Sequence, residues 1–181
     1  MTGHAGPAEK LMDKSLQQRK QLPHGIPSWV TDKAVFFVTI CCKDKVRNQL
    51  CHDDVAKLIF ESVEFRQEKK DWFVYLWLLM HDHMHVLVSL PVDKSMKQVI
   101  AKWKEYVAKR TGIRWQRDFF DHRLRSGESY VEKAAYIRMN PVRAGLVERP
   151  EDWKYVWEGS VLQEKSGGSG GPALPEEQSV S

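Results

Sequence analysis

The segment HDHMHVLV, residues 81 to 88, places three histidines within five residues, between two apolar runs. Residues two apart on a β-strand point to the same face, so a strand here would present His83 and His85 side by side, with Met84 turned away. A pair of imidazoles on one face is a typical arrangement of metal ligands. An ordinary structural role for the two histidines stays open. His81 would point to the same face as His83 and His85, but it lies at the turn before the strand.

Two histidines leave a divalent ion under-coordinated, so a third protein ligand must come from elsewhere. Tyr136 and Asn140 are four residues apart, on one face of a helix that we expect to end at Asn140 before Pro141. From that helix a tyrosine and an amide oxygen could converge on one ion. The alternative is a core tyrosine followed by an ordinary helix stop, and the helix pattern by itself leaves both open.

The elements that must position these residues follow from hydrophobic periodicity. Runs of β-branched and aromatic residues predict strands at 34–42, 73–80 and 84–90, the last two joined by a tight turn at His81-Asp82. Apolar residues at near-helical spacing predict helices at 52–70, 95–110 and 127–140, with a strand or extended loop at 115–125. This order predicts an α+β fold of one domain: a ferredoxin-like antiparallel sheet with helices packed on one face.

Length and composition indicate a single domain with tails. The chain has 181 residues, 42% of them apolar, and we expect a basic N-terminal arm at 1–33, the domain at 34–157, and a flexible, acidic, Gly/Ser-rich tail at 158–181. The one long apolar stretch, 72–90, is interrupted by ionisable residues, which argues against a membrane span. Three cysteines suggest no disulfide framework, so a reducing cytoplasm is the expected location.

Positive charge is concentrated in one part of the chain. Residues 97–149 hold 13 Lys and Arg against 6 Asp and Glu, whereas 151–181 hold 2 against 6. A polyanion would dock on the basic part, although a charge run is often only a solvated face.

These features together resemble a known family. The His83-Met84-His85 strand after LLMHDH, the segment FFDHRLRSGESYVEKAAYIRMNPVRAGLV at 119–147, and the arm RKQLPHGIPSWV at 19–30 closely resemble the REP-associated tyrosine transposases of bacteria, members of the HUH single-strand nuclease superfamily. The resemblance covers roughly residues 15 to 157. One departure is MHDH, where such proteins more often have a Met-Pro turn before the first ligand.

The resemblance implies a Mg²⁺- or Mn²⁺-dependent endonuclease and strand transferase that acts on single-stranded DNA next to palindromic hairpins. It assigns His83, His85 and Asn140 as metal ligands and Tyr136 as the nucleophile that forms a 5′-phosphotyrosine bond. Tyr130 is six residues earlier and points elsewhere on the helix. The covalent bond conserves the energy of the phosphodiester, so that a 3′-OH can rejoin the strand without ATP.

The resemblance also suggests the partner and its contacts. We expect hairpin DNA with unpaired flanks to bind a monomer or homodimer in the bacterial cytoplasm, associated with the nucleoid. The expected phosphate contacts are Arg19, Lys20, Lys102, Lys104, Lys109, Arg110, Arg123, Arg125 and Arg143. Trp103 or Trp115 could stack on a base or belong to the core, and His122 could handle a phosphate or be structural.

Two other functions compete with this one. A hairpin DNA- or RNA-binding protein of the same fold would bind without cutting. A zinc hydrolase that uses His83 and His85 is weaker, because no carboxylate or cysteine stands at ligand spacing near the pair.

Overall fold

The computed structural model describes residues 34–125 and 128–159. Arg19 and Lys20, the rest of the expected arm, and the tail from residue 160 lie outside the described residues. The main elements are β1 (Phe36–Cys41), α1 (Asp53–Glu68), β2 (Phe73–Leu79), β3 (His83–Ser89), α2 (Met96–Thr111), β4 (Phe120–Arg123), α3 (Tyr130–Arg138), α4 (Asn140–Arg143) and β5 (Val156–Glu158), with a short 3₁₀ turn at Pro150–Asp152.

The sheet has the order β4-β1-β3-β2-β5, and its neighbouring strands are antiparallel. Because β3 lies antiparallel between β1 and β2, those two strands run parallel, and α1 connects them across one face. The first four strands therefore have the ferredoxin-like arrangement, which confirms the predicted fold class. β5 extends the sheet beyond β2, and the sequence reading did not predict it.

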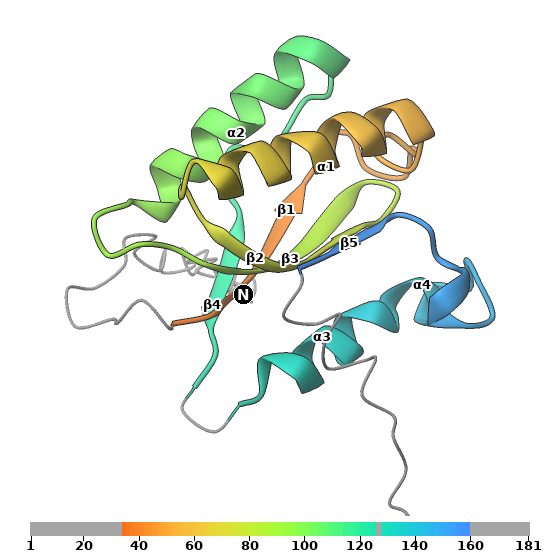
Figure 1. Ribbon diagram of the computed structural model, residues 1–181. Helices are drawn as coiled ribbons and strands as arrows, with labels where there is room; N and C mark the ends of the chain where they lie inside the picture. Colours follow the sequence, from red (N-terminus) through yellow and green to blue (C-terminus); the bar gives the residue numbers. More distant parts are fainter. Residues whose placement is uncertain (1–33, 126–127, 160–181) are drawn as a thin grey trace, which may run out of the picture.

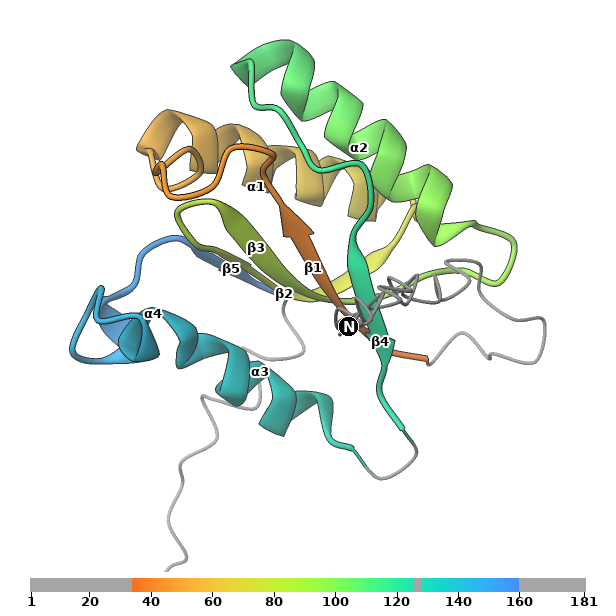
Figure 2. The same ribbon diagram turned by 180° about the vertical axis from the view of Figure 1, so that it is seen from behind.

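The helices cover both faces of the sheet. α1 and α2 lie side by side on one face, while α3 and α4 lie on the other (Figures 1 and 2). The prediction that all helices pack on one face was therefore wrong. The physical reason is visible in β3, where Val86, Leu87 and Val88 are all buried, so both faces of the strand need a cover.

The core between the sheet and α1/α2 is built around tryptophans. Trp77 of β2 and Trp103 of α2 are almost fully buried, with ring centroids 4.9 Å apart. Trp103 Nε1 donates to Ser62 Oγ at 2.9 Å, and Trp77 Nε1 donates to Met84 Sδ at 3.1 Å. These bonds satisfy both indole groups, so Trp103 is a core residue and does not stack on a base.

Helix ends mostly follow local rules. α2 ends at Thr111 and is capped by Gly112, whose φ of 74° is the left-handed conformation that glycine adopts at little cost. The predicted helix at 127–140 is instead α3, a turn at Met139, and then α4, in which Pro141 occupies the first turn. Proline is tolerated there because its missing N–H would have no partner within the helix. No helix in the described parts of the chain is long and apolar enough to cross a membrane.

Candidate active site and nucleic-acid interface

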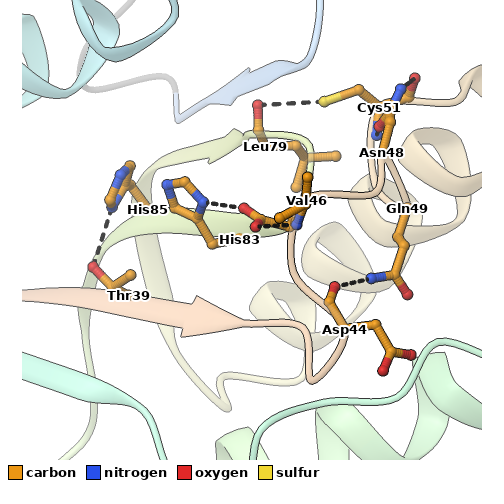
Figure 3. A network of polar contacts seen from close by, with 10 residues as sticks. Thr39, Asp44, Val46, Asn48, Gln49, Cys51, Leu79, His83 and His85 are labelled. Atoms are coloured by element: carbon orange, nitrogen blue, oxygen red, sulfur yellow. Dashed lines mark hydrogen bonds and ion pairs between the residues drawn. The ribbon is translucent and has the colours of Figure 1, made fainter. Parts of the chain in front are cut away.

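His83 and His85 stand on the same face of β3, as predicted. Their ring centroids are 4.9 Å apart, and the rings meet edge to face (Figure 3). Met84, between them, points into the core on the α1/α2 side, where Trp77 donates to its sulfur. The two imidazoles therefore lie on the face that α3 covers.

The Nδ1 atoms of both histidines have partners on the protein. His83 Nδ1 donates to Asp82 Oδ1 at 2.7 Å, and the other oxygen of Asp82 accepts from the backbone N–H of Val46 at 3.1 Å (Figure 3). His85 Nδ1 shares a hydrogen bond of 3.1 Å with Thr39 Oγ1 on β1. Partners of this kind fix ring orientation, and a ring that donates through Nδ1 carries its lone pair on Nε2.

The electrostatics suit metal binding. Burial, followed by the charge of nearby His83, lowers the pKa of His85 to about 4, so that this ring is neutral at pH 7. Burial acts to raise the pKa of Asp82, but the hydrogen bonds from His83 and the Val46 N–H outweigh it and lower that pKa. An ionised Asp82 then holds the Nδ1 proton of His83 in place.

α3 is anchored over the histidine face at both ends. Ser129 caps its start, with Oγ accepting from the N–H of Val131 at 3.2 Å, and Tyr130 packs on Tyr75 of β2 with ring centroids 4.9 Å apart. At its other end Arg138 is ion-paired with Glu158 of β5. Tyr130 is thus a packing residue, as expected if Tyr136 is the nucleophile.

Tyr136 lies on this face with 56% of its surface exposed. The ammonium of Lys133 is 5.3 Å from the centre of the Tyr136 ring and 5.0 Å from that of Phe37 on β1. Phe37 in turn stacks on His85, with centroids 5.5 Å apart. Lys133 and Phe37 therefore connect the tyrosine to the histidine pair, and both were missed by the sequence reading.

Arg143 joins Tyr136 to Asn140. Its guanidinium carbon is 4.1 Å from the centre of the tyrosine ring, Nη2 donates to the Tyr136 carbonyl at 3.1 Å, and Nη1 donates to Asn140 Oδ1 at 2.9 Å. An amide oxygen has two lone pairs, so this bond leaves Asn140 one further acceptor position. Asn140 is the first residue of α4, whereas the sequence predicted it at a helix end.

The candidate donors are the two imidazoles of β3 and the amide oxygen of Asn140. Within 34–125 and 128–159, no three His, Cys, Asp or Glu side chains gather as a ligand group. The amide oxygen of Asn140, with phosphate and water oxygens, is the kind of donor that Mg²⁺ or Mn²⁺ prefers, and two imidazoles alone leave a divalent ion under-coordinated. His81 lies apart from the strand pair: it is in the turn before β3, with its ring 6.3 Å from that of Trp153.

The structure distributes the expected phosphate contacts over different surfaces. Lys102, Lys109 and Arg110 are exposed on α2, on the far side of the sheet from the histidines, and Lys109 is ion-paired with Glu105. Arg123 pairs with Phe36 in the β1–β4 register, which directs it toward the α1/α2 face as well. Of the described candidates, Arg143 is in contact with Tyr136, and Arg125 is exposed in the segment between β4 and α3.

Lys104 was predicted to contact phosphate, and the structure does not support this. Its residue surface is only 8% exposed, and its ammonium donates to the carbonyls of Gln116 at 2.6 Å and Arg117 at 3.1 Å. Trp115 is half-buried and donates to the Lys104 carbonyl at 3.0 Å. Both residues hold the segment before β4 against α2.

Comparison with known proteins identifies the family. The model of the family described as "Transposase IS200 like" matches residues 34–131, more than half of the chain. The chain belongs to the IS200-like transposase family. The match includes the His83–His85 strand and ends before Tyr136 and Asn140, so it supports an enzyme of the transposase kind and leaves the roles of those two residues to be proposed.

Individual relatives of the chain are also described as transposases. A REP-associated tyrosine transposase of Escherichia coli K12 is 25% identical over 125 residues, which are 66% of this chain and 73% of the relative. A Haemophilus influenzae protein described as "Putative REP-associated tyrosine transposase" is 25% identical over 145 residues, 69% of this chain and 80% of its own length. These similarities confirm the resemblance found from the motifs.

A solved structure has the same fold. The REP-associated tyrosine transposase bound to a REP hairpin superposes with a TM-score of 0.63 at 18% identity, covering 84% of this chain and 92% of the other. At that identity the similarity confirms the antiparallel α+β fold of this transposase, and nothing about individual side chains.

Proposed function

We propose that this transposase is a single-strand DNA endonuclease and strand transferase that cuts next to palindromic hairpins through a covalent bond to Tyr136. One observation supports this most strongly: α3 holds an exposed tyrosine over the sheet face that carries His83 and His85. The relative whose structure is similar was bound to a REP hairpin, which makes hairpin DNA the expected partner here as well.

The proposed metal site uses side chains from two elements. His83 and His85 would hold Mg²⁺ or Mn²⁺ through Nε2, and Asn140 would complete the protein ligands through Oδ1. When bound, such an ion would neutralise charge on the oxygens of the scissile phosphate. Asp82 and Thr39 keep the two rings oriented for this task.

The bond change takes place at Tyr136. Its phenol oxygen loses its proton and attacks the phosphorus, the bond from phosphorus to the 3′ oxygen breaks, and the leaving oxygen takes up a proton as a free 3′-OH. Lys133 and Arg143 flank the ring with positive charge, which favours a bound phosphodiester at this place. Attack by another 3′-OH on the phosphotyrosine reverses the step and joins a new strand end.

Cleavage of a labelled REP hairpin with unpaired flanks tests this function. With Mg²⁺ or Mn²⁺ we expect a cut in the flank and a protein-linked fragment, and EDTA should abolish both. A duplex of the same sequence should not be cut, because the flank cannot enter the site while it is paired. Binding without any cut, with each metal, would instead favour the non-catalytic hairpin-binding protein.

A further inference from the structure

An exposed phenylalanine stands in line with the histidine pair. In the sheet, Phe120 of β4 is directly opposite Thr39 of β1, and Thr39 is directly opposite His85 of β3. Residues directly opposite one another share a face, so the three side chains form one row across the α3 face. Phe120 is therefore two strand spacings, about 10 Å, from the backbone of His85.

Phe120 offers more exposed ring surface than Phe37, its aromatic neighbour on β1. Phe37, beside it on β1, is half-buried, with Lys133 over its ring and His85 stacked on it. Phe120 is 55% exposed on a strand of four residues at the sheet edge. The exposed part of this apolar ring suits a ligand with a flat apolar face.

The positive charge over Phe37, the neighbour of Phe120, indicates what that ligand is. Lys133 lies over Phe37, between the row of Phe120 and the exposed Tyr136. Aromatic rings for the bases together with cations for the phosphates are the usual composition of single-strand nucleic-acid sites. A base can lie on a protein ring only after it has left its own stack, and an unpaired flank satisfies this condition.

We propose that Phe120 stacks on an unpaired base of the DNA flank, next to the phosphate that Tyr136 attacks, with Lys133 contacting the adjoining phosphate. This inference rests on the proposed function, since the flank reaches the row only if it passes the histidine pair. The stacked base sets which nucleotide lies beside the scissile bond. Stacking depends little on base identity, so Phe120 positions the strand and does not read its sequence.

Binding measurements test the role of Phe120 in the full-length Tyr136→Phe protein, in which no cut interferes. The probes are a fluorescent REP hairpin with unpaired flanks and the same hairpin without them. Phe120→Ala should weaken binding of the flanked hairpin about 5- to 100-fold. It should leave the flankless hairpin unaffected, and Phe120→Trp should restore the affinity.

Two controls separate stacking from a loss of structure. Phe65→Ala removes a ring of similar exposure, 58%, from α1 on the other side of the sheet and should change nothing. Phe120→Leu retains apolar bulk if the alanine variant folds poorly, and it should still bind more weakly. Abasic sites are then placed along the flank one at a time. At one position the abasic site should make the affinities of the Tyr136→Phe protein with and without Phe120→Ala equal.

Loss of affinity for both hairpins alike, or no position at which the abasic site removes the difference, would overturn the inference. Its failure is distinguishable from that of the proposed function. If the protein with Tyr136 intact forms the tyrosine adduct, while Phe120→Ala binds the flanked hairpin with normal affinity, the proposed function stands and the stacking role is wrong. If the Phe120 effect is present but no adduct forms, the stacking role stands and the nuclease function is wrong.

Discussion

The Nδ1–H of His83 donates a hydrogen bond of 2.7 Å to the carboxylate of Asp82, and the same carboxylate accepts a hydrogen bond from the backbone N–H of Val46. The residue that precedes the first proposed ligand thus orients it and ties the turn to the loop after β1. Outer partners of this kind commonly change metal affinity by about 10- to 100-fold.

Asp82→Ala is therefore expected to weaken Mn²⁺ binding by about 10- to 100-fold without loss of the fold. The affinity can be measured by calorimetric titration of the purified protein, with circular dichroism as the check on folding. Asp44→Ala is the matched control, because its carboxylate is ion-paired with the exposed Arg114 side chain, and it should leave Mn²⁺ affinity unchanged. Equal Mn²⁺ affinity in the Asp82 variant would show that His83 is oriented by other means.

Arg143 should matter for its shape as well as its charge. Arg143→Lys retains the positive charge but cannot contact the Tyr136 carbonyl, the Tyr136 ring and Asn140 together. We expect adduct formation to slow by about tenfold or more, since small misplacements of a nucleophile are costly, while hairpin affinity falls much less. Single-turnover kinetics measure the rate.

The control for this change is Arg149→Lys, which alters an exposed arginine paired with Asp152. It should leave the rate of adduct formation as in the parent protein. If the two lysine variants behave alike, the contacts of Arg143 do not position the tyrosine.

Acid should destabilise the protein through His85. Its pKa is about 4 in the folded chain and near 6.5 when unfolded, so the unfolded state binds the proton more tightly. The stability due to the neutral ring is present above pH 6.5 and is lost as the pH falls through 4, by roughly 3 kcal/mol in total. Urea unfolding in EDTA across this range measures it.

In His85→Gln this part of the acid sensitivity should be absent. His122→Gln changes an exposed histidine on β4 and should retain the parental pH dependence. A His85→Gln protein that loses stability with acid as steeply as the parent would mean that the ring is not held neutral.

Lys104 should behave as a structural residue. Lys104→Met removes the donor to the carbonyls of Gln116 and Arg117, and we expect a loss of roughly 2 to 4 kcal/mol in the free energy of unfolding. The salt dependence of hairpin binding should not change. Lys102→Met, an exposed neighbour on α2, should have little effect on stability. If hairpin binding by Lys104→Met, but not by Lys102→Met, depends less on salt concentration than binding by the parent protein, Lys104 contacts a phosphate after all.

The sheet and the histidine pair could be predicted because they depend on short-range patterns. The apolar runs of β2 and β3, with the His81-Asp82 turn between them, place His83 and His85 on one face by alternation alone. The three residues of β5 were too few to produce a pattern. The side on which α3 packs was misjudged, although the unbroken apolar stretch of β3 already indicated a strand covered on both faces.

The cluster around Tyr136 was only half predictable. Taking Pro141 as a helix end hid the fact that Lys133, Tyr136, Asn140 and Arg143 follow one helical face across the Met139 turn. Lys104 was misread because charge alone does not show burial. Its carbonyl partners come from a segment whose position depends on the tertiary structure.

The central claim is that Tyr136 forms the covalent bond to DNA, and detection of the adduct tests it most directly. The full-length protein is incubated with a labelled flanked hairpin and Mn²⁺, denatured, and resolved by gel, and the linked peptide is located by mass spectrometry. We expect the adduct in the parent and in Tyr130→Phe, the linkage at Tyr136, and no adduct in Tyr136→Phe, which still binds the hairpin. An adduct that persists in Tyr136→Phe, or one located on another residue, would contradict the account.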